Sequence, residues 1–128
     1  MCNNIIVRTF IIMSKLLYAL ALITIANIGT WFQFQGHYWS DKLIFKSPWF
    51  ICGVGAILSM LFWNATRFSY EYFGQYWNIR LMGFGMGTVV FGLMTWLLTH
   101  EVPTLKTFIC LLLAVAIILI QITNVSDV

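Results

Sequence analysis

Charged residues divide this 128-residue chain into four long stretches that carry no charge. Twenty-five uncharged residues lie between Lys15 and Asp41. Windows of 20 uncharged residues follow between Lys46 and Arg67, between Arg80 and Glu101, and between Lys106 and Asp127. An α-helix needs about 20 mostly apolar residues to cross the hydrocarbon of a bilayer. The pattern therefore predicts an all-α polytopic membrane protein with four transmembrane helices and short loops.

The composition points to the same environment, because 9% of the residues are charged and 61% are hydrophobic. A soluble domain usually has about 25% charged residues. The net charge of +3 comes without a basic cluster of the kind that nucleic acid requires. These numbers argue against a soluble globule, a disordered chain and a nucleic-acid-binding module. We expect the lipid bilayer as a partner, and no nucleic acid.

The charges and prolines give the expected helix limits. We place the helices at residues 14–34, 48–67, 76–99 and 103–123, within a single membrane domain of residues 1–128. Pro48 and Pro103 stand where proline suits the first helical turn. The longest loop is expected at residues 35–46, and a short interfacial turn at residues 67–75. The first uncharged run extends far beyond the apolar region of a signal peptide, which favours a retained first span.

The positive charges do not fix the orientation of these helices. Four Lys or Arg residues fall on the side of the N-terminus and three on the other side. The four on the side of the N-terminus are Arg8, Lys15, Arg67 and Arg80, and the three on the other side are Lys42, Lys46 and Lys106. The positive-inside rule needs a clearer imbalance. An inside N-terminus is slightly favoured, while insertion in both orientations and an orientation set by a partner stay open.

A polar stripe runs along the first predicted helix. Thr24, Asn27 and Trp31 are three and four residues apart and therefore share one face, with Asn27 near the centre of the membrane. The stripe can line a substrate pathway, or it can form an interhelical hydrogen bond, worth about 0.6–2 kcal/mol. An asparagine does not titrate near neutral pH, so Asn27 itself cannot couple transport to protons.

Glycines gather in the third predicted helix at Gly83, Gly85 and Gly87. Gly83 and Gly87 form a GxxxG motif, which lets two helix backbones approach closely. Three glycines in five residues also weaken a helix, by about 1 kcal/mol each relative to alanine in water. The cluster predicts either a face for helix packing or a hinge.

Motifs of enzymes are missing from the sequence, which has no HExxH, GxSxG or P-loop. The three cysteines, which include Cys2, show no metal-binding spacing. Cys52 and Cys110 lie in apolar runs, where we expect them to be small buried side chains. The sequence therefore predicts a non-enzyme with no catalytic residues, no metal and no cofactor.

A few charged groups are expected at the ends of the helices. Glu71 lies near Arg80, and Arg67 precedes Glu71 by four residues, so we expect an interfacial ion pair there. His100 closes the third predicted helix. It either senses pH or is simply solvated.

Three features of the second half of the chain point to a known family. They are Phe62-Trp63 followed by Gly83-Phe84-Gly85 at a fixed separation, the acidic turn of residues 99–104, and the plain apolar helix of residues 107–121. In these features the chain resembles the drug/metabolite transporter superfamily, and within it the small multidrug resistance transporters. The resemblance implies a four-helix fold, an antiparallel homodimer with its contact at the last helix, and transport of a small molecule.

Two departures bear on the activity that the resemblance implies. Members of the family carry a mid-membrane glutamate in the first helix, which binds proton and cation, whereas Asn27 is the nearest polar group here. Members of the family also carry an aromatic residue shortly before the glycine pair, and this chain has Leu81 at that position. The nearest aromatic residue that could replace it is Trp77. Proton-coupled export of drug cations is therefore not expected. Instead we expect Asn27 to bind a substrate, with Trp31, Trp63 and Trp77 as apolar walls.

Two functions stay open from the sequence. The first is a small transporter-like protein that binds or moves a small metabolite by alternating access, as a homodimer. The alternative is a non-catalytic accessory subunit of a larger membrane complex, for which 11 Phe, 6 Trp and 6 Met provide an adaptable surface. A channel subunit is a third reading, although the rings of charge and the filter loop typical of pores are missing.

Overall fold

The computed structural model describes residues 2–123, and every regular element in this range is helical. In chain order these elements are α1 (Cys2–Trp39), the 3₁₀ helix η1 (Leu43–Lys46), α2 (Pro48–Phe73), α3 (Tyr76–Thr99) and α4 (Leu105–Thr123). Each of the four α-helices is long and apolar enough to cross a membrane. The prediction of an all-α chain with four such helices is confirmed, and this is the architecture of a multi-pass membrane protein.

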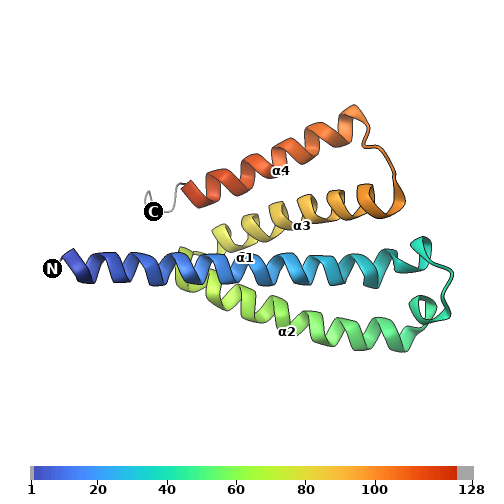
Figure 1. Ribbon diagram of the computed structural model, residues 1–128, viewed down its shortest axis with the longest axis horizontal. Coiled ribbons are helices and arrows are strands. Elements are labelled where there is room, and N and C mark those ends of the chain that lie inside the picture. The colour runs from blue at the N-terminus through green and yellow to red at the C-terminus, as the bar shows by residue number, and fades with distance from the viewer. Residues whose placement is uncertain (1, 124–128) are drawn as a thin grey trace.

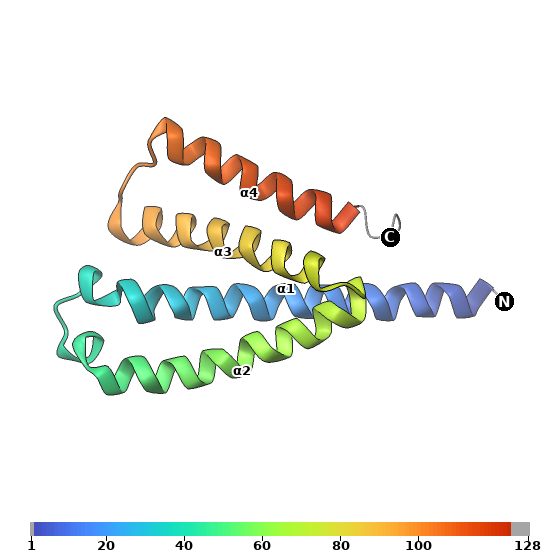
Figure 2. The same ribbon diagram turned by 180° about the vertical axis from the view of Figure 1, so that it is seen from behind.

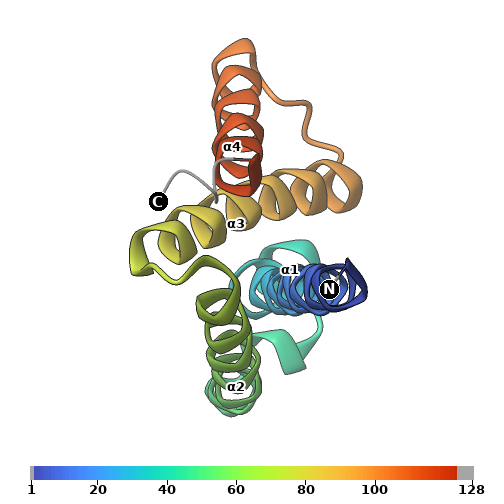
Figure 3. The ribbon, with the colours of Figure 1, turned by 90° about the vertical axis from the view of Figure 1, so that its left-hand side faces the viewer.

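The helices are arranged as two antiparallel hairpins (Figure 1). The first hairpin contains α1 and α2, and the second contains α3 and α4. Seen along the bundle, α1 and α3 are in the middle, with α2 on one side and α4 on the other (Figure 3). The α1–α3 contact therefore holds the two hairpins together, and α4 packs on the side of α3 that faces away from α1.

Helix α1 is much longer than the predicted range of residues 14–34. Its 38 residues give a length of about 57 Å, against about 30 Å for the hydrocarbon of a bilayer. Residues 2–14 project beyond the other helices and are exposed (Figure 2). The prediction failed because Arg8 and Lys15 were taken to mark the end of a span, although both residue types are good helix formers.

The connections are shorter than predicted. Helix α1 continues to Trp39 and the segment after it contains η1, so the expected loop at residues 35–46 is largely helical. Helix α2 continues to Phe73, so most of the expected turn at residues 67–75 is helix as well. The chain reverses at Gly74, whose φ of 69° lies in the left-handed region that glycine adopts without strain.

Helices α3 and α4 lie close to their expected limits. Helix α3 covers residues 76–99 as one continuous helix and is closed by His100, whose backbone N–H donates to the carbonyl of Trp96 at 3.1 Å. Helix α4 begins at Leu105 rather than at the expected residue 103. The hydroxyl of Thr104 accepts a hydrogen bond of 3.3 Å from the backbone N–H of Thr107 and so caps the first turn.

The buried core is small, and its cluster of packed residues lies near the turn between α2 and α3. This cluster consists of Leu16, Phe73 and Met82, one residue from each of α1, α2 and α3, and further buried apolar residues such as Trp31 and Val90 lie elsewhere in α1 and α3. Most large apolar side chains of the described residues are exposed instead, as suits helices that face lipid. The prediction that Cys52 and Cys110 are buried is wrong, because both are exposed. An apolar stretch of a membrane helix can face lipid as well as the core, so apolar neighbours do not imply burial.

Candidate functional site

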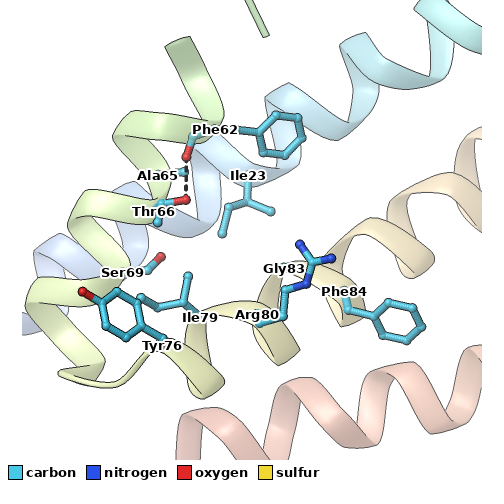
Figure 4. Close-up of a pocket in the computed structure, with 10 residues that line it drawn as sticks. All are labelled: Ile23, Phe62, Ala65, Thr66, Ser69, Tyr76, Ile79, Arg80, Gly83 and Phe84. Atoms are coloured by element: carbon cyan, nitrogen blue, oxygen red, sulfur yellow. Dashed lines mark hydrogen bonds between the residues drawn. The ribbon is translucent and has the colours of Figure 1, made fainter. Parts of the chain in front are cut away.

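A cavity of about 640 Å³ lies between α1, α2 and α3, close to the turn that joins α2 to α3 (Figure 4). Its apolar lining comes from all three helices and consists of Ile23, Phe62, Ala65, Ile79, Gly83 and Phe84. Its polar lining consists of Thr66, Ser69, Tyr76 and Arg80. An apolar cavity with a few converging polar groups is the usual form of a small-molecule site.

Arg80 brings a positive charge to this cavity. It lies about 6 Å along α3 from the start of the helix, at 1.5 Å per residue. Figure 4 shows its guanidinium directed from α3 into the cavity, toward the side where Ile23 and Phe62 lie. Within residues 2–123, no carboxylate forms an ion pair with Arg80.

The ion pairs of this region lie outside the cavity. The Glu71 carboxylate forms ion pairs with Lys15, whose Nζ lies 2.6 Å away, and with Arg67, whose Nε lies 4.0 Å away. The expected pairing of Glu71 with Arg67 is therefore present, whereas the pairing with Arg80 is not. The reason is the helical phase: Lys15 of α1 stands opposite Glu71, while Arg80 is on the face of α3 that lines the cavity.

Ser69 provides an available hydroxyl at the wall of the cavity. The residue is 1% exposed, and its hydroxyl makes no hydrogen bond to the described residues. Ser69 nevertheless belongs to the lining of the cavity (Figure 4). One turn earlier, Thr66 donates its hydroxyl proton to the carbonyl of Phe62 at 2.8 Å and can only accept further hydrogen bonds.

The predicted polar stripe of α1 lies in the α1–α3 contact rather than in the cavity lining. Asn27 Nδ2 donates to the carbonyl of Ile23 in its own helix at 2.8 Å. Its Oδ1 faces Gly87, where an added Cβ would approach it to 3.1 Å. Thr24 likewise donates to its own helix, to the carbonyl of Leu20 at 2.8 Å. Asn27 thus contacts α3 where a glycine leaves room for it.

Trp31 forms the interhelical hydrogen bond that the sequence suggested for this stripe. Its indole is 2% exposed, and Nε1 donates to Thr95 Oγ1 of α3 at 3.0 Å. The structure therefore brings Asn27 and Trp31 together along one face of α1, against α3.

The other two predicted wall residues lie on the outside of the bundle. Trp63 is 59% exposed and Trp77 is 77% exposed. The guanidinium of Arg67 lies 5.8 Å from the centre of a Trp63 ring, within the range of a cation–π interaction. Of the Phe62-Trp63 pair, only Phe62 lines the cavity.

The three clustered glycines of α3, Gly83, Gly85 and Gly87, face three different surroundings. Gly83 lines the cavity, and a Cβ there would meet nothing within 4 Å. A Cβ on Gly85 would lie 2.8 Å from Ile118 Cγ1 and 3.1 Å from the carbonyl oxygen of Ala114, so Gly85 permits the close approach of α4. Gly87 faces Asn27 of α1.

The sequence analysis did not select Ser69 or Arg80 as site residues. Ser69 falls in the expected turn at residues 67–75, and Arg80 is expected only at a helix boundary and in an interfacial ion pair with Glu71. Extending α2 by two turns would have placed Phe62, Thr66 and Ser69 on one face, at spacings of four and three residues. Arg80 and Gly83 of α3 are three residues apart and therefore also share one helix face.

Comparison with models of known protein families, with curated proteins and with solved structures finds no match for this chain. The resemblance to the small multidrug resistance transporters stays a prediction from the motifs within residues 62–121. The function is accordingly argued from the geometry of the cavity.

Proposed function

We propose that the chain is a small transporter-like membrane protein that binds or moves a small metabolite in the cavity between α1, α2 and α3. The observation that carries this proposal is the cavity itself. Its volume of about 640 Å³ falls within the range of about 300–1,000 Å³ that small-molecule sites occupy. Its lining combines apolar walls with the hydroxyl-bearing Ser69 and with the guanidinium of Arg80, which has no carboxylate partner within residues 2–123.

Alternating access supplies the mechanism, and the chain acts as a homodimer. The two hairpins move relative to each other about the short turn at Gly74, and the cavity lies directly beside this turn. The α1–α3 contact is where this movement occurs, with Asn27 facing Gly87. Helix α4 is available for the dimer contact, because its outward face is exposed and Ala114 is its one buried residue within the described part.

Filling the cavity tests this proposal. In Gly83→Leu the new side chain has room within the protomer and occupies the cavity, so we expect the variant to lose a small molecule that co-purifies with the wild-type protein in mild detergent. The matched control is Gly53→Leu on α2, where a Cβ also meets nothing within 4 Å but which is not part of the lining of this cavity. Native mass spectrometry of both variants gives the readout. Equal ligand occupancy in Gly83→Leu and wild type would contradict the proposal.

An accessory subunit is the second candidate, and the projecting segment of α1 favours it. Residues 2–14 expose large apolar side chains beyond the bundle; these are Ile5, Ile6, Val7, Phe10, Ile11, Ile12 and Met13. Such a segment suits a contact with another membrane protein. If this candidate holds, a chain lacking residues 2–14 loses larger co-purifying proteins while its four-helix bundle persists. Retention of the same partners by the shortened chain would argue against it.

A further inference from the structure

We infer that the cavity binds the anionic group of an amphiphilic molecule, with Arg80 as its counter-ion and Ser69 as a hydrogen-bond donor. The inference rests on the proposed function, because it assigns a substrate class to the same cavity. It also reverses the charge of the ligand relative to the cations that the resembled family exports.

The charge of Arg80 is the first argument. It is the charged residue of the cavity lining, and no Asp or Glu is among the lining residues. A guanidinium remains protonated at all physiological pH values and offers a planar set of donors that matches carboxylate and phosphate oxygens. Arg67, nearby on α2, differs because Glu71 and Trp63 already contact it. Arg80 is therefore the cation in this region that is free to bind an anion, among the described residues.

The hydrogen-bonding capacity of the cavity is the second argument. Ser69 belongs to the lining of the cavity, and its hydroxyl can donate one hydrogen bond. The guanidinium of Arg80 has five N–H donors and no acceptor, so it gives the cavity an excess of donors. A carboxylate or phosphate accepts such hydrogen bonds through several oxygens, whereas an ammonium group would be repelled by Arg80 and would leave its donors unsatisfied.

The apolar walls are the third argument. Ile23, Phe62, Ile79 and Phe84 surround the space into which Arg80 projects (Figure 4). These side chains favour an apolar body attached to the anionic group, because apolar surface packs against apolar surface without leaving polar groups unsatisfied. Two sources have this chemistry: an anionic membrane phospholipid and a water-soluble aromatic acid or phosphate.

The test compares the two sources on the full-length protein in detergent. Native mass spectrometry measures binding of phosphatidylglycerol against zwitterionic phosphatidylcholine, and titration calorimetry measures binding of phenyl phosphate against neutral benzyl alcohol. Preference for phosphatidylglycerol identifies a lipid, and preference for phenyl phosphate identifies a soluble ligand; either supports the inference. A wild-type protein that prefers neither anion over its uncharged counterpart overturns it.

Variants locate the site. Arg80→Gln should weaken binding of the preferred anion by about tenfold or more, because a charged hydrogen bond is lost. Arg67→Gln is the matched control and should bind as the wild type does. Ser69→Ala, which removes a buried hydroxyl without adding volume, should also weaken anion binding. Equal losses in Arg80→Gln and Arg67→Gln would show a general charge effect and overturn the inference.

The failure of this inference can be distinguished from that of the proposed function. If Gly83→Leu abolishes binding of an uncharged molecule while Arg80→Gln and Ser69→Ala leave it unchanged, the cavity is a binding site for neutral ligands. The proposed function then stands and the anionic substrate class is wrong. If none of the three substitutions alters binding of any ligand, both are wrong.

Discussion

Trp31 of α1 donates its indole N–H to the hydroxyl of Thr95 on α3, at 3.0 Å, in a contact where the indole is almost fully buried. The bond joins the two hairpins at the end of the bundle opposite the cavity. It stabilises the α1–α3 contact of this conformation far from Gly74, where the chain connects the hairpins covalently. Movement of the hairpins during alternating access would therefore have to break this hydrogen bond.

Removing the acceptor of this bond should destabilise the bundle. Thr95→Val leaves the Trp31 N–H buried without a partner, and we expect the free energy of unfolding to fall by about 1–2 kcal/mol. Reversible unfolding in mixed micelles measures the change. The control is Thr99→Val, since the Thr99 hydroxyl donates within its own helix, to the carbonyl of Thr95 at 2.6 Å. Equal effects of the two substitutions would show that the interhelical bond contributes no stability.

The glycines of α3 predict a graded effect of added methyl groups. Gly85→Ala should lower the free energy of unfolding by about 1–3 kcal/mol, because the new Cβ meets the backbone of α4 at Ala114. Gly87→Ala should cost less, since Asn27 Oδ1 is the end of a side chain that can move. Gly53→Ala, in open surroundings, should not lower stability. A different order of the three variants in the same unfolding assay would contradict the packing seen at Gly85.

The ion pair of Lys15 with Glu71 predicts a salt-dependent effect. Glu71→Gln removes the partner of Lys15 and of Arg67 and should lower the unfolding midpoint at low ionic strength. The difference from the wild type should shrink at 1 M salt, where the Debye length is about 3 Å. Asp41→Asn is the control, because the Asp41 side chain is fully exposed and its Lys46 contact is longer, at 3.7 Å. A salt-independent difference would point to packing rather than charge.

The number of helices and the limits of α3 were predictable because charges are excluded from the hydrocarbon over about 20 residues. The ends of α1 and α2 were not, because a charge such as Arg8 or Glu71 does not terminate a helix that leaves the bilayer. Helix ends depend on local backbone geometry instead, as at Gly74.

The cavity was less predictable than the helices. In a soluble protein, the apolar stripe of a helix marks its buried face. In a membrane helix the face toward lipid is equally apolar, so the sequence does not show which side is buried. Trp31 and Trp63 both lie in uncharged, apolar stretches of the sequence, yet Trp31 is buried against α3 and Trp63 is exposed. Ser69 could be found only once α2 was known to extend to Phe73.

The length of α1 has a consequence for how the chain sits in a membrane. A rod of about 57 Å would need a tilt of about 58° to fit within 30 Å of hydrocarbon, beyond the range of about 0–40° seen for membrane helices. The first turns of α1 therefore stand as an arm at one membrane surface, on the side of the turn between α2 and α3 (Figure 1). A population inserted in one orientation displays this arm on one surface, and a population inserted both ways displays it on both. When protease is added to one side of sealed vesicles, the fraction of arms that it removes therefore measures the fraction of chains inserted in that orientation.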